Sequence, residues 1–351
     1  MAVEPPVQRG KRLIDIKRES GGSFQLGEPG DAIVAMMALE CRLLTVTQKA
    51  VYGTNFADHI DPDRTDISLP NIISQKLLDY GAETPFICET LLTGAELFNE
   101  TYLGQNFNRR RALEIAFEAA RNLAAIADLR VALAHDQKNA AEKLRSTPIG
   151  RTIELPRTSG LRSRGEALIR HADLTCQATQ AISGMFYQKE KPNDGWAGHI
   201  TQCLSPATAI NVQTAGFLKW VLHCIEEVRD FRNACEHPDE EKAVIFRDIS
   251  LKPGLIATAP SIEIKHPRSP QPAVELLSLG DRLITQCGKV FEGMVALLCS
   301  ENIRMFGGHA SIFNCVLAER EEAQRNNGVR YAYHVSPKPG VAWPPSTDSA
   351  K

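Results

Sequence analysis

The chain has 351 residues, with 40 Lys and Arg against 42 Asp and Glu, so its formal net charge is −2. This length allows one sizeable domain with additions, or two domains, and the balanced charge excludes a global field that would attract nucleic acid. The nine cysteines show no CxxC pair and no metal-ligand spacing, which is typical of reduced core thiols in a cytoplasmic protein. We expect no metal and no cofactor. We also expect no membrane segment, because no apolar run nears the roughly eighteen residues that span a bilayer.

The first part of the chain predicts a flexible arm followed by helices. Residues 1–30 are rich in Gly, Pro and charge, as is typical of an arm without fixed structure. Residues 31–105 predict an N-terminal helical region, with one helix over 31–52 and shorter helices over 71–80 and 85–98.

The middle of the chain predicts longer helices. The longest helical pattern runs over 108–144, where a high density of alanine favours helix and allows a neighbouring helix to approach closely. A linker over 145–165 carries prolines, glycines and five arginines, and another helix is predicted over 166–187.

A strongly amphipathic segment then begins near Ser205, which fits a helix N-cap. Its apolar side chains recur at helical spacing up to Val228, and the next position on that stripe is Arg232. A charge on an apolar face must find partners or lie at an opening of the core. Pro238 biases the preceding residue, His237, away from helical backbone angles. His237 is therefore free to turn back toward Arg232.

After this segment the pattern changes period. Two short stretches rich in β-branched residues, 243–249 and 255–264, flank a Lys-Pro-Gly turn signal and predict a β-hairpin. Pro272 opens another long helical pattern that runs to about Ser300.

The C-terminal extension, residues 303–351, has a weak strand pattern over 329–335 and a proline-rich tail from Ser336 that we expect to be disordered. Several long helices around one hairpin define the predicted fold class, which is mostly α.

The order of helix, Arg-Asn-x-x-x-His, β-hairpin and helix resembles the HEPN superfamily, whose signature is an Arg, usually followed by a polar residue, with a His a few residues later. The resemblance covers about 108–302 and is best over 206–300. It implies an HEPN-like helical bundle over 106–302, with a β-hairpin insertion at 243–264 and an N-terminal helical extension.

The resemblance also implies a function. Many members are metal-independent endoribonucleases, often toxins or phage-defence effectors, which dimerise so that two motifs face one composite active site. It implies an RNA substrate, a homodimer and an antitoxin or nucleotidyltransferase partner, with Arg232 and His237 as the catalytic pair and Asn233 as the polar neighbour. The chemistry is coherent, because a histidine can accept or donate a proton near neutral pH and the planar fork of arginine suits phosphate oxygens.

The spacing alone does not select this motif. Four pairs have an arginine followed at similar spacing by a histidine: Arg130/His135, Arg164/His171, Arg232/His237 and Arg304/His309. A couple of such pairs are expected from the composition. The third pair alone combines an asparagine, a helix end and a following hairpin.

A second interpretation needs no catalysis. Arg232 can pair with Glu236 one turn later, while His237 merely ends the helix favourably for its dipole. The protein would then be a non-catalytic helical interaction module that binds a partner protein or a nucleotide. The position of Arg232 and His237 discriminates between the two hypotheses: an open electropositive cleft favours cleavage, and a buried, paired arginine favours the module.

Overall fold

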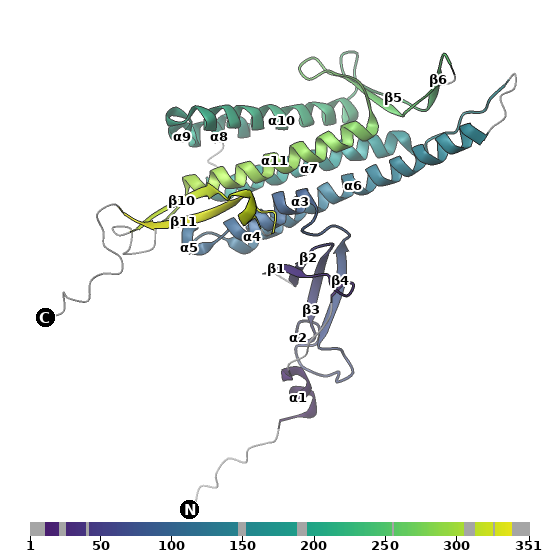
Figure 1. Cartoon of the computed structure of the whole chain (residues 1–351). Helices are drawn as coiled ribbons and strands as arrows, with labels where there is room; N and C mark the ends of the chain where they lie inside the picture. The colour runs from purple at the N-terminus through teal and green to yellow at the C-terminus, as the bar shows by residue number, and fades with distance from the viewer. Residues whose placement is uncertain are drawn as a thin grey trace, which may run out of the picture. The chain divides into compact units, whose positions relative to one another are not determined.

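The computed structural model describes residues 11–20, 26–39, 42–146, 152–187, 195–254, 256–304, 313–325 and 327–338. The chain divides into two compact units, Met1–Thr84 and Pro85–Lys351, which are considered separately here (Figure 1). About 54% of the structure is helix and 20% is strand, and the described residues form sheets of four, three, two and two strands. The fold is therefore mixed α/β, and the prediction of a mostly α, HEPN-like helical bundle with an N-terminal helical extension is wrong.

The first unit contains a four-stranded antiparallel sheet with strand order β1-β2-β3-β4. Its strands are β1 (Ile33–Ala38), β2 (Leu43–Thr47), β3 (Val51–Phe56) and β4 (Ile72–Leu78). The helices predicted over 31–52 and 71–80 are thus strands. The short β2 segment, Leu-Leu-Thr-Val-Thr, fits either structure, because a short stretch with apolar residues at neighbouring positions does not reveal its period. Its buried β-branched residues and a turn in which Ala50 accepts from Thr47 N–H at 2.9 Å favour the hairpin.

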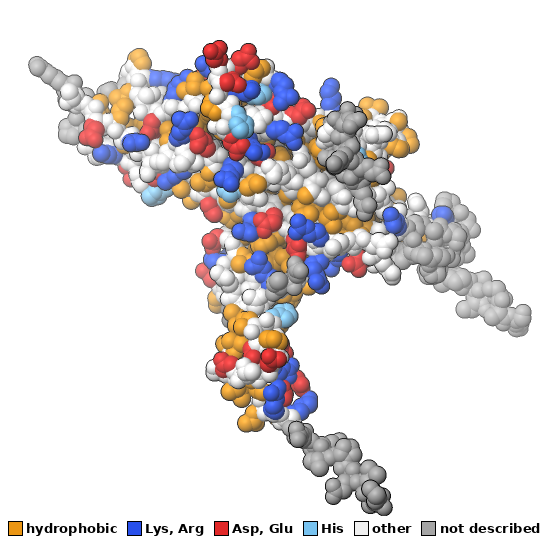
Figure 2. All heavy atoms as spheres, turned by 180° about the vertical axis from the view of Figure 1, so that it is seen from behind, with side chains coloured by type: hydrophobic (Ala, Val, Ile, Leu, Met, Phe, Trp, Pro, Cys, Tyr) orange, Lys and Arg blue, Asp and Glu red, His pale blue; other side chains and the backbone are white. Residues whose placement is uncertain are grey.

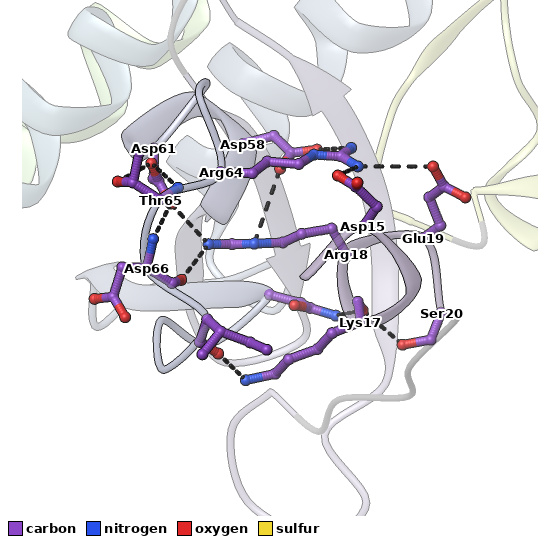
Figure 3. A network of polar contacts seen from close by, with 12 residues as sticks. Asp15, Lys17, Arg18, Glu19, Ser20, Asp58, Asp61, Arg64, Thr65 and Asp66 are labelled. Carbon is purple, nitrogen blue, oxygen red and sulfur yellow. Dashed lines mark hydrogen bonds and ion pairs between the residues drawn. The ribbon is translucent and has the colours of Figure 1, made fainter. Parts of the chain in front are cut away.

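A network of charges joins helix α1 (Leu13–Glu19) to the segment after α2 (Ala57–Ile60) in this unit (Figure 3). The Arg18 side chain is only 2% exposed, and its Nη2 donates to the Asp66 carbonyl at 3.1 Å and to Asp61 Oδ2 at 3.4 Å. Arg64 donates to both oxygens of Asp58, at 2.8 and 3.2 Å, and to Asp15 at 3.2 Å. Part of the predicted arm is therefore a helix held by ion pairs, while residues 1–10 and 21–25 of that arm lie outside the described residues.

The second unit is built on four long helices that run alongside one another (Figure 1). They are α6 (Arg109–Ser146), α7 (Leu161–Phe186), α10 (Val212–Glu236) and α11 (Leu276–Glu301). The helices predicted over 108–144 and 166–187 are confirmed. Between Pro85 and Leu103 the chain forms α3 (Pro85–Ile87), the π-helical turn η1 (Cys88–Leu92), α4 (Thr93–Leu97) and α5 (Glu100–Leu103).

Helix α11 supplies much of the core of this unit. Its inward face, including Leu283, Phe291 and Met294, is buried. By length and composition alone α11 could cross a membrane, but 61% of its most apolar window is buried within this unit, as in the core helix of a globular protein. Among the described residues, α11 is therefore an exception to the expectation that no apolar run approaches the length that spans a bilayer.

A three-stranded sheet lies at one end of the long helices, with strand order β5-β8-β9. Its strands are β5 (Ala243–Arg247), β8 (Ser261–Lys265) and β9 (Gln271–Glu275), and the connection between β5 and β8 forms the small hairpin of β6 (Ser250–Lys252) and β7 (Ile256–Thr258). The predicted hairpin is thus confirmed. The third strand, β9, lies where the sequence predicts the start of a helix at Pro272. A proline fits the start of a helix but also fits an edge strand, where its missing N–H is tolerated.

The other end of the long helices carries an antiparallel hairpin, β10 (Phe313–Glu319) and β11 (Tyr331–Pro337), with the 3-10 turn η2 (Glu322–Gln324) between them (Figure 1). The strand predicted over 329–335 is confirmed. The predicted disordered tail lies, from residue 339 on, outside the described residues.

The carboxylates of the first unit should make it sensitive to acid. The Arg12 guanidinium lowers the pKa of Asp15 to about 2, and backbone N–H groups of Asp66 and Thr65 lower the pKa of Asp61. A carboxylate with a lowered folded-state pKa stabilises the fold above its unfolded pKa and loses that effect as protons bind. The free energy of unfolding of this unit should therefore fall as the pH drops from about 4 toward 2.

Hydrogen exchange of the β2 and β3 amides measures this loss in the full chain. Asp61→Asn should lower protection at neutral pH and flatten its acid dependence. Asp63→Asn is the matched control, because Asp63 lies exposed in the same loop. Equal behaviour of the two variants would contradict this role for Asp61.

A second titration is expected at Glu89 in the π-helical turn. Burial raises the pKa of Glu89 to about 7, and the nearby carboxylate of Glu292 adds to the rise. Glu89 lies so close to α11 that a Cβ at Gly288 would overlap its carboxylate. Because the folded state then holds a proton that the unfolded state has lost, the free energy of unfolding should fall as the pH rises from about 4.5 to 7.

Urea unfolding at several pH values between 4 and 8 tests this expectation. Glu89→Gln should reduce the decline and be more stable than the wild type at pH 8, whereas the control Glu100→Gln, at an exposed position on α5, should keep it. An unchanged slope in Glu89→Gln would disprove the assignment.

Candidate ligand site around Arg232

Helix α10 carries the Arg-Asn-x-x-x-His motif at its C-terminal end. The predicted segment from Ser205 divides in two, α9 (Ser205–Ile210) and α10, because Asn211 caps α10 by accepting from Gln213 N–H at 2.9 Å and from Thr214 N–H at 3.3 Å. At the other end His237 has left the helix, with φ −131° and ψ 61°. The effect predicted for Pro238 on the backbone of His237 is thus confirmed.

Two carboxylates hold the guanidinium of Arg232. Its Nε donates to Glu236 Oε2 at 2.9 Å and its Nη2 lies 2.8 Å from the same oxygen, while Nη1 donates to Asp173 Oδ2 at 3.2 Å. The hydrogen bond from Arg232 lowers the pKa of Glu236, and Glu236 in turn raises the pKa of Arg232. The Arg232 side chain is 38% exposed and that of Asp173 only 8%. Arg232 therefore links α10 to α7 through a largely buried carboxylate.

His237 and Asn233 do not join Arg232 in a shared site within one chain. His237 is exposed, and no described residue hydrogen-bonds its ring. Asn233 is half-buried, and its carbonyl accepts from the His237 N–H at 2.9 Å. The carboxylate of Glu236 lies within electrostatic reach of both Arg232 and His237. The three predicted residues thus cluster at one helix end, but an acidic side chain lies among them.

Arg232 instead lines a cavity of 460 Å³ between α7, α10 and the short helix α8 (Gly195–Cys203). Its wall is made of Asp173, Gln177, Gln180, Ala181, Ser183, Gly184, Tyr187, Trp196, His199, Arg229 and Arg232. Arg229 lies one helical turn before Arg232, is exposed, and forms no hydrogen bond or ion pair with the described residues. The cavity therefore holds two arginines and a histidine against the single carboxylate of Asp173, and His237 is not on its wall.

Aromatic and amide groups complete this wall. The indole N–H of Trp196 donates to Ser183 Oγ at 2.7 Å, which ties α8 to α7. The Tyr187 hydroxyl accepts from Asn302 Nδ2 at 3.1 Å, and burial raises the pKa of Tyr187. On α7 the Gln177 amide donates to Asp173 Oδ2 at 2.6 Å. Neighbouring side chains thus hold Trp196, Tyr187 and Gln177 in place.

The other arginine–histidine pairs have structural partners. Arg130 is paired with Asp281, and His135 contacts Asn139. Arg164 donates to Asp136 at 2.6 Å, and His171 Nδ1 lies 3.0 Å from Asn122 Oδ1. His309 of the fourth pair lies outside the described residues.

Asp173, Trp196 and Arg229 are not among the site residues predicted from the sequence. Asp173 had a detectable signal, because it lies at helical spacing from the buried Ile169 and Cys176, like Arg232 on its own stripe. Two charges on facing apolar stripes predict an ion pair. Within the described ranges no group of three or more His, Cys, Asp or Glu side chains is placed to hold a metal ion.

Comparison with known proteins identifies no family for this chain. No model of a protein family, no curated protein and no solved structure matches the chain.

The two partners of Arg232 should differ in their effect on stability. Asp173→Ala removes a buried acceptor that serves both Arg232 and Gln177, and should lower the free energy of unfolding by about 1–3 kcal/mol. Glu236→Ala breaks an exposed pair one turn apart and should cost only about 0.5 kcal/mol. Urea unfolding measures both, and an equal cost for the two variants would contradict the view that Asp173 is the structural partner.

Proposed function

We propose that the Pro85–Lys351 unit is a non-catalytic binding module that takes a small anionic ligand of the nucleotide class in the cavity between α7, α8 and α10. The observation that carries this proposal is the placement of the motif arginine. Arg232 lines the cavity next to Arg229, which has no partner among the described residues, while His237 lies outside the cavity.

The two arginines suit an anion. An arginine has five N–H donors, and the contacts of Arg232 with Glu236 and Asp173 use about three of them. The remaining donors are held in a fixed orientation, so little freedom is lost when they bind phosphate oxygens. Arg229 adds a second, unneutralised charge one turn away.

The rest of the wall suits a planar ring that carries hydrogen-bonding groups. Trp196 and Tyr187 offer aromatic surface for stacking, and the amides of Gln177 and Gln180 offer both donors and acceptors. The volume of 460 Å³ lies in the range usual for small-molecule sites. A nucleotide matches this wall, because its phosphate suits the arginines and its heterocyclic base suits the aromatic and amide groups.

RNA cleavage by the same chain has less support. A general base must come within hydrogen-bond reach of the proton that it removes, and His237 is outside the cavity. Figure 2 shows basic and acidic side chains interspersed on the face drawn, without a broad basic surface for a polynucleotide.

Nucleotide titrations test the proposal. The full chain should bind AMP or ATP in calorimetry at low salt, and binding should weaken as salt screens the arginines. Arg229→Gln should weaken binding at least about tenfold, which is about 1.4 kcal/mol, and Trp196→Ala should also weaken it. The control is Arg121→Gln, an exposed arginine on α6 away from the cavity. Absence of binding, or equal affinities for Arg229→Gln and the control, would reject the proposal.

Endoribonuclease activity is the second candidate, and the free ring of His237 favours it. An exposed imidazole without a described partner can meet a motif from a second copy of the chain, as in a homodimer with one composite site. An antitoxin or nucleotidyltransferase partner belongs to this hypothesis. RNA cleavage by the wild type that His237→Ala and Arg232→Ala abolish would establish it and overturn the non-catalytic proposal; uncut RNA across pH would count against it.

A further inference from the structure

Strand β1 lies at one edge of the four-stranded sheet, because β2 is the only described strand that pairs with it. Its register with β2 shifts between Ile33 and Ala35 and is regular from there to Ala38. An edge strand leaves backbone N–H and C=O groups without a partner in the sheet. Residues 35–38 are therefore the part of β1 that another extended strand can join.

The composition of β1 is that of an interior strand. Its sequence, Ile-Val-Ala-Met-Met-Ala, contains no charge and no proline, like the interior strands β2 and β3. Charges and prolines on an edge discourage pairing with another chain. Every other described edge strand of five or more residues carries one of them: Lys76 in β4, Arg247 in β5, Glu275 in β9, Glu319 in β10 and Pro337 in β11. Among these strands β1 alone lacks this protection.

The hydrogen-bonding pattern shows which groups of β1 face outward. Where the chain turns from β1 into β2, the Leu39 N–H donates to the Arg42 carbonyl at 2.9 Å. In an antiparallel pair, residues that exchange hydrogen bonds alternate with residues that do not. Met37, two residues before Leu39, therefore bonds to β2, whereas Met36 and Ala38 direct their N–H and C=O groups away from it. Both Met36 and Ala38 are exposed.

We propose that β1 pairs antiparallel with β1 of a second copy of the chain, which joins two four-stranded sheets into one. In this pairing the backbone of Met36 in each copy exchanges hydrogen bonds with Ala38 of the other. Met37 then lies opposite Met37 of the second copy. The outward N–H and C=O groups of both edges thereby gain partners.

The absence of charge selects a second copy as the occupant. A two-fold antiparallel pair places β1 against its own sequence, so any charge on it would meet the same charge at close range. Here the cross-strand neighbours are all apolar. Met37 and Leu39 are buried on the inner face of the sheet, and a two-fold axis perpendicular to the sheet keeps the inner faces of both copies on the same side.

The opposite edge of the sheet resists the same pairing. Lys76 on β4 forms an ion pair with Asp79, and its side chain is 51% exposed. A lysine on an edge disfavours the approach of another strand. The joined sheet therefore ends at β4 on both sides, and the assembly closes at two copies.

This dimer differs from the one implied by the HEPN resemblance, in which two motifs face one site. The β1 contact lies within Met1–Thr84, whereas every residue that lines the cavity around Arg232 belongs to Pro85–Lys351. The proposed dimer therefore does not rest on nucleotide binding, and either proposal can fail without the other.

Sedimentation velocity of the full chain over about 1–100 μM tests the assembly. The wild type should form a dimer that dissociates on dilution. Met36→Lys should raise the dissociation constant at least about tenfold, because it puts a charge on the paired edge. The Met36 side chain is on an exposed residue, at 53%, so the monomer tolerates the lysine.

Ile60→Lys is the matched control for this variant. Ile60 lies in α2 of the same unit, away from the edge, and is also 53% exposed. Its substitution should leave the dissociation constant unchanged. A wild type that is monomeric over the whole range, or equal effects of the two variants, would overturn the proposal.

Amide hydrogen exchange identifies the paired surface. The Ala38 amide should exchange slowly in the wild-type dimer and fast in Met36→Lys, while the β2 amides stay protected in both, which shows that the variant is folded. A dimer whose Ala38 amide exchanges freely uses another surface, and a monomer whose Ala38 amide is protected covers the edge with its own chain. Either result would refute pairing through β1.

Discussion

The contact between Arg232 and Asp173 joins α10 to α7, and much of the second unit is arranged around that contact. Asp173 lies on the buried face of α7 and needs a partner, so α10 must present its arginine at this level. The requirement fixes the axial register of the two helices. It also turns the arginine toward the space under α8 and leaves the histidine at the helix end outside. A catalytic site would need Arg232 and His237 to face the same space. The ion pair with Asp173 instead directs Arg232 into the cavity, and His237 stays outside it.

Helix α10 carries a second buried carboxylate two residues before Arg232. Asp230 faces the sheet, where it holds the β8–β9 turn through Arg268, Ser269 and His266. Two residues on one turn of α10 thus reach two separate cavities: Arg232 lines the one beside α8, and Asp230 contacts His266 on the wall of the other, which lies at the β8–β9 turn. The helix acts as a rigid spacer between them, because Leu218, Val221 and Val228 anchor it in the core.

The sequence predicted the long helices because their signals are local. Alanine density over 108–144 and the effect of Pro238 on His237 do not depend on distant residues. The first unit forms strands where helices were expected because β2 is buried on both faces and therefore shows no alternation of apolar and polar residues. The misplaced charge of Arg232 could be found from the sequence, but its partner could not. Which face of α7 meets α10 is decided by packing across 59 residues of chain.

Pro272 has a consequence for how the protein behaves beside other copies of itself. It lies in β9, at one edge of the three-stranded sheet. An edge strand normally offers a row of unpaired N–H and C=O groups to any extended segment that approaches. Pro272 removes a donor from that row, and its ring obstructs a flat neighbour. Pro272, which in the sequence predicts a helix start instead of this strand, thus also discourages intermolecular β-pairing. It thereby protects the sheet from aggregation along β9.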